Sequence, residues 1–343
     1  MKTLTLFIAR FSFLLFFLAP AATLCAQQQT DVPRRGEGIT TFLERHGRTP
    51  RLYYADFLEL NRKRLRGSKE LRMGVAYVVP PLKEAAGTAT KGSSRRRKVV
   101  KEPLLGKRHA EVKVTSNRLA GACFYLSSGH GGPDPGAIAR VGRHELHEDE
   151  YAYDITLRLA RYLLSEGAEV RIIIQDAKDG IRDDAYLSNS KRETCMGKAI
   201  PLGQVARLKQ RSDKINELYR KDRKRYKYCR SVFIHVDSRG RGEKMDVYFY
   251  HAAGSRPGEQ LAEALQTTFK NKYDTHQPGR GFTGTVSERG LYVLQHTDPV
   301  GVFIELGNIQ NQSDLRRLII SDNREALAKW LKDGIVKDYR ENQ

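Results

Sequence analysis

Short apolar runs alternate with stretches of helical periodicity from Leu119 to the end of the chain, and this alternation constrains the fold more than any other feature. Tyr151, Ile155, Leu159 and Leu163, for example, repeat every four residues, as the buried stripe of an amphipathic helix does. Strands that alternate with helices predict one α/β domain with a mostly parallel or mixed sheet flanked by helices. The expected strands are 122–126, 170–174, 231–235, 246–250, 290–294 and 300–305.

Three polar residues stand where expected strands end. His130 follows the first strand, His235 ends the strand over 231–235, and Glu305 ends the strand over 300–305. In an open α/β sheet the reacting groups collect at the carboxyl edge of the strands. We therefore expect these three side chains to converge at one edge.

A fourth candidate, Glu148, is placed by helical register. It precedes Tyr151 and Ile155 in a three-then-four rhythm, so its carboxylate lies on the inward stripe of the helix. A carboxylate that faces a core is costly unless a cation or several donors meet it, which favours metal ligation. An N-terminal capping acid is the alternative, because the first turn of a helix attracts negative charge. His144, Glu145 and His147 compete as ligands, and the register favours Glu148 over them.

Five motifs from Ala122 to Tyr339 occur in the order that one enzyme family shows. They are Gly-His-Gly-Gly with Asp-Pro-Gly-Ala at 129–137, a Glu that opens an amphipathic helix at 148, Arg-x-x-x-Ile-Asn at 211–216, Phe-Ile-His-Val-Asp at 233–237 and Glu-x-Gly-Asn-x-x-Asn at 305–311. The stretch resembles N-acetylmuramoyl-L-alanine amidases of the zinc-dependent amidase 3 family. It departs from that family's usual residues in Ile215 for Ala, Asp237 for Asn and Asn308 for an aromatic residue.

The resemblance implies a zinc site formed by His130, Glu148 and His235, with Glu305 as the catalytic acid and base. Two imidazoles and one carboxylate leave a fourth zinc position for water, whose pKa zinc lowers to roughly 7. Glu305 would take the water proton and return it to the departing nitrogen. The implied reaction is hydrolysis of the amide between the lactyl group of N-acetylmuramic acid and L-alanine.

Two further residues of the matching motifs, Arg211 and Asn216, are candidates for substrate binding. Arg211 shares the inward face of its helix with Ile215 and Leu218, where it could position a substrate carboxylate or form a structural ion pair. A histidine tautomer at a zinc site is usually fixed by an acceptor behind the ring, and the sequence does not identify that acceptor.

The first residues predict export. Two basic residues precede an apolar run at 11–20 and small residues at 21–26, an order typical of a cleaved signal peptide over 1–26. Cys25 raises the alternative of a lipid anchor, although the bulky Leu24 before it argues against that reading. No later segment is long and apolar enough to span a bilayer. We therefore expect a periplasmic or secreted protein.

The formal net charge of +20 needs an anionic partner or extensive solvation. Nucleic acid is excluded as the expected partner because no binding motif supports it and an exported protein rarely meets it. Peptidoglycan and other envelope polymers are the available anions, and an activating envelope protein is a further candidate partner. Solvated helix faces account for much of the charge.

A small α+β module is expected over 34–81, a basic linker over 82–117 and the catalytic domain over 118–343. The module predicts a strand, two short helices and a strand, and it resembles a degenerate LysM glycan-binding module. The resemblance rests on Gly-Glu-Gly at 36–38, a central Asn61 and Gly-Val-Ala-Tyr-Val-Val-Pro at 74–80. A generic small adaptor is the alternative. A strand at 111–114 is expected to join the linker to the catalytic domain.

Residues 176–210 form a long polar insertion beside the expected site, which is either a lid or a plain surface loop. An oxidising compartment permits a disulfide between Cys195 and Cys229, although the sequence does not show that they meet. Cys123 lies in a strand pattern and is expected to be buried.

Three functions remain open. The first is an exported zinc amidase. The second is a zinc peptidase that cuts within the peptide stem, and the third is a catalytically silent glycan-binding regulator of the same fold. The presence of all four site positions argues against the third.

Overall fold

A computed structural model describes residues 29–34, 37–48, 50–68, 70–81, 98–237 and 244–342. The chain divides into two units, Met1–Ser93 and Ser94–Gln343, and each is described by itself. The signal peptide predicted over 1–26, with Cys25, lies outside the described residues, so its prediction stands untested. Among the described helices, none is both long and apolar enough to cross a membrane.

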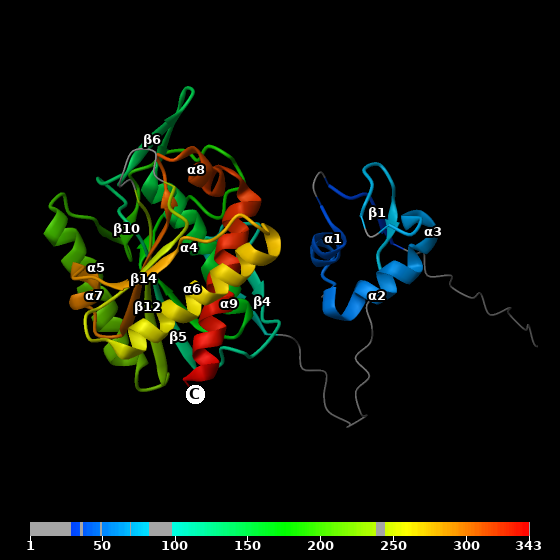
Figure 1. Ribbon diagram of the computed structural model, residues 1–343. Coiled ribbons are helices and arrows are strands. Elements are labelled where there is room, and N and C mark those ends of the chain that lie inside the picture. Colours follow the sequence, from blue (N-terminus) through cyan, green and yellow to red (C-terminus); the bar gives the residue numbers. More distant parts are fainter. Residues whose placement is uncertain are drawn as a thin grey trace, which may run out of the picture. The chain divides into compact units, whose positions relative to one another are not determined.

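A six-stranded mixed sheet forms the centre of the second unit, in the order β14-β13-β15-β12-β5-β8 (Figure 1). The neighbouring strands β15, β12, β5 and β8 run parallel, whereas β13 is antiparallel to β15 and parallel to β14. This confirms the predicted α/β class with a mixed sheet. The strands are β5 (Ala122–Ser128), β8 (Glu169–Ile172), β12 (Tyr228–Asp237), β13 (Tyr248–His251), β14 (Thr285–Glu288) and β15 (Val300–Asn308).

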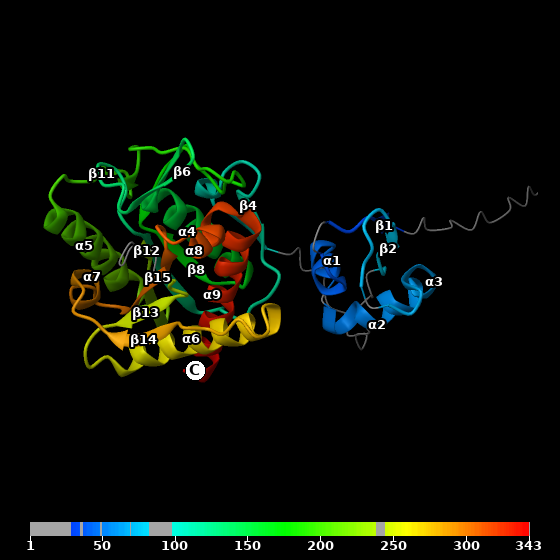
Figure 2. The same ribbon diagram turned by 45° about the horizontal axis from the view of Figure 1, so that its top comes forward.

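Helices cover both faces of the sheet (Figures 1 and 2). One face packs against α4 (Glu148–Ser165), α6 (Arg256–His276) and α9 (Ser321–Glu341), and the other against α5 (Gln204–Asp222) and α7 (Tyr292–Gln295). The short α8 (Gln312–Ile319) follows β15.

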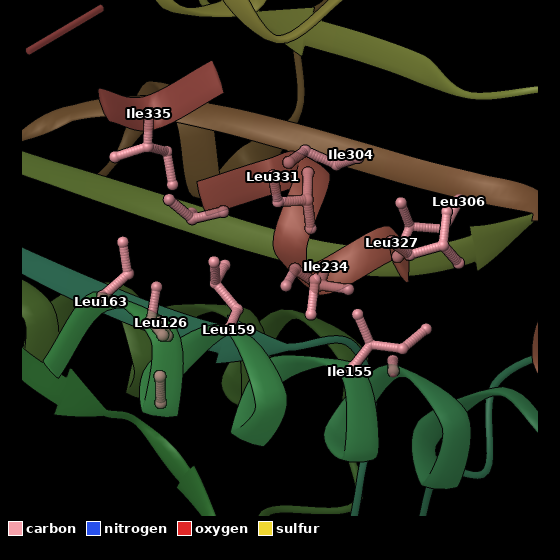
Figure 3. Packing of buried hydrophobic residues seen from close by; sticks show 14 of the residues in the cluster. Leu126, Ile155, Leu159, Leu163, Ile234, Ile304, Leu306, Leu327, Leu331 and Ile335 are labelled. Carbon is pink, nitrogen blue, oxygen red and sulfur yellow. The ribbon is translucent and has the colours of Figure 1, made fainter. Parts of the chain in front are cut away.

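The larger core lies between the sheet and the pair α4 and α9, whose leucine and isoleucine side chains interdigitate (Figure 3). Ile155, Leu159 and Leu163 of α4 are fully buried, as their four-residue spacing predicts. Burial of each such side chain stabilises the fold by about 1.5–3 kcal/mol relative to its exposure. This packing fixes α4, and therefore the residue at its first position, against the sheet.

One expected strand is wrong. Residues 290–294 contain most of α7 instead, and the strand just before it, β14, lies at one edge of the sheet. Val293 and Leu294 are adjacent and both buried, which one turn of helix allows and a half-exposed strand does not. An apolar run of this length does not by itself distinguish a strand from a short buried helix.

The second half of the predicted linker belongs to the second unit. Residues from 98 onward form β3 (Val99–Lys101), the 3-10 turn Pro103–Leu105 and β4 (Glu111–Lys113). Leu105 and Val112 are buried in the larger core, so this segment packs as part of the domain. Strand β4 agrees with the strand expected at 111–114. Two core residues in a polar stretch are too few to give a periodic signal, which explains the misplaced boundary.

The first unit contains β1 (Thr30–Asp31), α1 (Ile39–Arg45), α2 (Pro50–Leu60), α3 (Arg62–Leu65) and β2 (Tyr77–Val78). Its two strands pair antiparallel, so the unit begins before the expected residue 34. The order agrees with the expected strand, helices and strand, with α3 added as a single extra turn. Phe42, Leu43, Phe57 and Tyr77 form its core.

Asn61 connects helix and strand inside this first unit. It is fully buried, its Nδ2 donates to the carbonyls of Phe57 and Val78 at 3.0 and 2.9 Å, and its Oδ1 accepts from the amide of Val78 at 2.7 Å. Asn61→Ala is expected to destabilise the unit by about 1–3 kcal/mol, because it leaves buried backbone groups unpaired. Hydrogen exchange should show faster exchange at Val78, whereas Glu59→Ala, on the exposed side of α2, should leave that rate unchanged.

Candidate metal centre

The carboxyl ends of three neighbouring strands bring His130, His235 and Glu305 to one edge of the sheet. Residue His235 of β12 is the register partner of Glu305 of β15, so their side chains leave the sheet on the same face. The chain leaves β5 at Ser128, opposite Ile234, and His130 follows two residues later. The predicted convergence of these three residues is confirmed.

Glu148 lies between the two imidazoles. Its Oε2 is 3.2 Å from His130 Nε2, and its Oε1 is 2.9 Å from His235 Nδ1. Backbone amides fix the carboxylate as well, since Oε2 accepts from Ala137 at 2.9 Å and Oε1 from Val236 at 3.0 Å. One ligand atom from each of the three side chains lies within 4.8 Å of the others. The register argument that put Glu148 on the inward face is therefore confirmed.

Burial and hydrogen bonds within the trio shift the pKa values of all three side chains. Burial alone would raise the pKa of Glu148, but hydrogen bonds from the two imidazoles hold it well below its usual range. Burial likewise opposes a charge on His130, yet its contacts with Asp134 and Glu148 raise its pKa to about 10. Burial lowers the pKa of His235. Two imidazole nitrogens and a carboxylate are a donor set that zinc takes, and here they converge without rearrangement of the backbone.

Asp134 is the acceptor behind His130 that the sequence did not identify. Its Oδ2 lies 2.8 Å from His130 Nδ1 and 2.7 Å from Arg207 Nη2. A proton held on Nδ1 by this carboxylate would leave the lone pair of Nε2 available to a metal. Asp134 belongs to the 129–137 motif. Its spacing of four residues from His130 was the one feature of the sequence that could have indicated this contact. On the other ring, Phe303 stacks against His235 with centroids 4.2 Å apart.

Asp134→Asn should lower zinc affinity about 10- to 100-fold, because the amide no longer provides a charged acceptor for His130 Nδ1. The same substitution at the exposed Asp213 of α5 should leave the affinity unchanged. Competition with a chromophoric chelator measures both. Equal affinities for the two variants would contradict the role given to Asp134.

Two glycines permit the close approach of these side chains. A Cβ on Gly129 would lie 2.4 Å from the His235 ring, and a Cβ on Gly136 would lie 2.6 Å from His130 and 2.7 Å from Glu148 Oε2. Gly136 also has a φ of +69°, in the left-handed region that favours glycine. The glycines of the 129–137 motif therefore make room for the candidate metal ligands.

Arg211 supports the loop that carries His130. It is buried, and its guanidinium donates to the carbonyls of Ser128 at 3.1 Å and His130 at 3.0 Å. Burial lowers its pKa to about 10. Its inward position is as predicted. These contacts hold the backbone that carries His130, and a role toward a substrate carboxylate stays a prediction.

The structure does not bring Asn216 to the metal centre. Its Nδ2 donates to the carbonyl of His296 at 2.9 Å, and its Oδ1 accepts from the amide of Asp298 at 2.7 Å. Both ends of the amide are used to hold the loop between α7 and β15. The substrate-binding role implied for Asn216 therefore has no support in its contacts.

The three rivals of Glu148 lie on a hairpin formed by β6 (Ile138–Val141) and β7 (His144–His147). His144 stacks on Tyr186 with centroids 3.9 Å apart, and Glu145 lies 3.3 Å from Arg140. His147 precedes the first turn of α4 and lies 3.8 Å from Glu145. None of the three belongs to the described cluster that contains His130 and His235.

A cavity of about 180 Å³ opens beside the two histidines on the α5 side of the sheet. Its wall is cationic where Arg207 contributes and apolar where α7 and β15 contribute. The residues around it are His130, Asp134, Gln204, Arg207, Leu208, Arg211, His235, Leu291, Tyr292, Val293 and Phe303. A substrate that carries both apolar and anionic groups fits such a wall.

The insertion folds against the metal centre. It forms a small antiparallel sheet of β9 (Ile174–Gln175), β10 (Thr194–Cys195) and β11 (Lys198–Ala199). Because α5 begins at Gln204, the insertion ends earlier than the expected residue 210. Glu193 accepts a hydrogen bond from the amide of Gly132 at 2.8 Å, which ties the insertion to the loop of His130. Whether it acts as a lid stays a prediction.

The three described cysteines are free thiols, all of them buried. Cys229 is the register partner of Cys123 on the adjacent strand β5. Cys195 lies on β10 of the small sheet. The disulfide between Cys195 and Cys229 is therefore not formed in this structure, whereas the predicted burial of Cys123 is confirmed.

Residues 125–337 match the profile of a family described as N-acetylmuramoyl-L-alanine amidase. The germination-specific N-acetylmuramoyl-L-alanine amidase of Bacillus subtilis is 24% identical over 233 residues, 67% of this chain and 84% of that protein. The probable cell wall amidase LytH of Staphylococcus aureus is 26% identical over 233 residues, 66% of this chain and 61% of LytH. A solved structure of the CwlD amidase from Clostridioides difficile, in complex with the GerS lipoprotein, aligns with 64% of this chain and 99% of its own at 22% identity and a TM-score of 0.47.

Proposed function

The chain belongs to the amidase 3 family of N-acetylmuramoyl-L-alanine amidases, and we propose on this basis that it is an exported, zinc-dependent member. Its substrate bond would be the amide between N-acetylmuramic acid and L-alanine in peptidoglycan. The observation that carries the zinc proposal is the convergence of His130, Glu148 and His235, with Glu305 beside His235 on the next strand.

In the proposed mechanism, His130, His235 and the Glu148 carboxylate would hold the metal. Zinc bound there would polarise an amide carbonyl and supply hydroxide near neutral pH. Glu305 removes a proton from the attacking water and delivers it to the departing nitrogen of L-alanine. Asp134 keeps the proton of His130 on Nδ1 throughout, and Phe303 holds the ring plane of His235.

The predicted export of the chain and its first unit extend the proposal. The signal peptide over 1–26 would bring the chain to the cell envelope, and its net charge of +20 suits anionic wall polymers. The LysM-like unit would bind glycan strands and concentrate the enzyme on its substrate. An envelope protein that activates the enzyme remains a further prediction.

A zinc peptidase that cuts within the stem is the second candidate, because the same residues would serve a neighbouring amide. The cavity beside His130 and His235 supports hydrolysis but does not choose between the two bonds. The products distinguish the two enzymes. An amidase frees L-alanine amino termini and leaves intact sugar chains, whereas a peptidase frees other amino termini. A silent glycan-binding regulator would release neither.

The test is digestion of purified peptidoglycan by the full chain, by the chelated chain and by the chelated chain with zinc restored. We expect L-alanine termini to be released by the first and third samples and not by the second. Release that survives exhaustive chelation would overturn the zinc mechanism. Release of other termini alone would favour the peptidase.

A further inference from the structure

A second cluster of acidic side chains includes the two residues that follow Glu148 in α4. Asp149 and Glu150 follow Glu148 in the first turn of α4, and Glu193 reaches them from the insertion. One carboxylate oxygen from each lies within 4.8 Å of the others, and all three side chains are buried. Buried carboxylates that face one another repel unless cations or donors offset their charge.

The donors around the cluster do not neutralise it. Arg182 lies 2.9 Å from Glu150 and also 3.0 Å from Asp179, so one cation serves two acids. Glu193 accepts from the Gly132 amide at 2.8 Å and from the Ser190 hydroxyl at 2.6 Å, which are neutral donors. Within the described ranges, Arg182 is the one arginine or lysine in ion-pair contact with the three acids.

Asp149 provides the separate observation. Its Oδ1 accepts from the amide of Glu150 at 2.9 Å, but its Oδ2 is buried without a hydrogen-bond partner among the described residues. The whole residue is only 3% exposed. An ionised carboxylate oxygen that is deprived of both water and donors is costly, and Asp149 is one of the three residues whose carboxylates converge.

We propose that Asp149, Glu150 and Glu193 bind a hard divalent cation, with calcium as the preferred ion. All the donors are carboxylate oxygens, which suit calcium or magnesium, whereas zinc at the first site takes nitrogen. Calcium accepts irregular oxygen cages more readily than magnesium does, and these ligands come from one helical turn and a distant loop. Each carboxylate oxygen keeps a lone pair beside its present donor.

The cation would join three parts of the active-site support. Asp149 and Glu150 belong to the turn that carries the zinc ligand Glu148, and Glu193 contacts the Gly132 amide two residues after His130. Binding would thus fix the insertion, the His130 loop and the start of α4 to one another. The site is chemically distinct from the proposed zinc site, so each can be tested without the other.

The experiment measures calcium, magnesium, manganese and zinc bound by the full chain after chelation, using equilibrium dialysis with elemental analysis. Thermal unfolding is followed in the same samples. The variants are Asp149→Asn, which keeps the shape and removes the charge, Glu193→Gln as a second change outside α4, and His130→Ala, which disables the zinc site. Asp213→Asn on exposed α5 is the matched control.

One calcium per chain is expected in the wild type, the control and His130→Ala. Calcium affinity should fall at least 10-fold in Asp149→Asn and in Glu193→Gln. Calcium at about 100 times its Kd should raise the wild-type midpoint by about 5–10 °C. The proposal is overturned if the wild type binds none of the hard cations at millimolar concentration, or if Asp149→Asn and Glu193→Gln bind calcium as the wild type does. Loss of zinc alone from His130→Ala bears only on the proposed function.

Discussion

Glu305→Gln is expected to lower the rate of amide cleavage by about 100- to 10,000-fold, the range typical of a lost general acid and base. The amide has nearly the shape of the carboxylate but cannot take a proton from water at neutral pH. Since Glu305 is not one of the three converging ligands, zinc content and thermal midpoint should change little. The loss should therefore fall on turnover rather than on metal binding.

Release of L-alanine termini from purified peptidoglycan measures this effect, with bound zinc determined in the same preparation. Glu263→Gln is the matched control, because Glu263 is exposed on α6, which packs on the opposite face of the sheet. A Glu305→Gln enzyme with wild-type turnover would remove Glu305 from the mechanism. A variant that loses zinc would show instead that Glu305 supports the metal.

The sequence predicted the positions of the candidate site residues for reasons that depend on regular geometry. His130, His235 and Glu305 follow strands whose carboxyl ends meet at one edge whatever the loops do. Glu148 follows from the 3.6-residue period of α4, because an inward leucine stripe fixes the direction of every earlier residue on that helix. These arguments need only local pattern and neighbouring parallel strands, and β5, β12 and β15 run parallel here.

The contacts of the residues around the candidate ligands could not be derived from sequence, because their partners are distant in sequence. Arg211 is inward by periodicity, but its acceptors are carbonyls of Ser128 and His130, and a carbonyl gives no sequence signal. Asn216 likewise binds the backbone of His296 and Asp298. A side chain that binds main chain can be placed on a helix face from sequence, but its role cannot be derived.

The structure of short elements also cannot be derived from local sequence alone. Residues 290–294 could form a strand or one helical turn, and only their packing between the sheet and α5 decides for α7. Leu105 and Val112 lie in a basic stretch whose composition indicates a linker, yet both are buried in the larger core. Tertiary contacts determine the secondary structure of such segments because their local conformational preferences are weak.

Glu148→Gln is expected to weaken zinc binding by more than about 100-fold, beyond the range seen when only a supporting residue is lost. The carboxylate oxygens now accept from the amides of Ala137 and Val236 and from both imidazoles. An amide in this position must turn its NH₂ toward one of those backbone donors, so the substitution removes the charge and also misdirects one ligand atom.

The control for this prediction is His144→Ala, at the rival position on β7. Its ring stacks on Tyr186, so its loss should not alter zinc affinity. Chelator competition at fixed pH measures both variants, and activity on peptidoglycan should fall in parallel with metal content for Glu148→Gln. Zinc affinity that survives Glu148→Gln and disappears in His144→Ala would mean that the hairpin, not the helix, supplies the third ligand. The two buried backbone donors that meet the Glu148 carboxylate are the physical reason to expect the opposite.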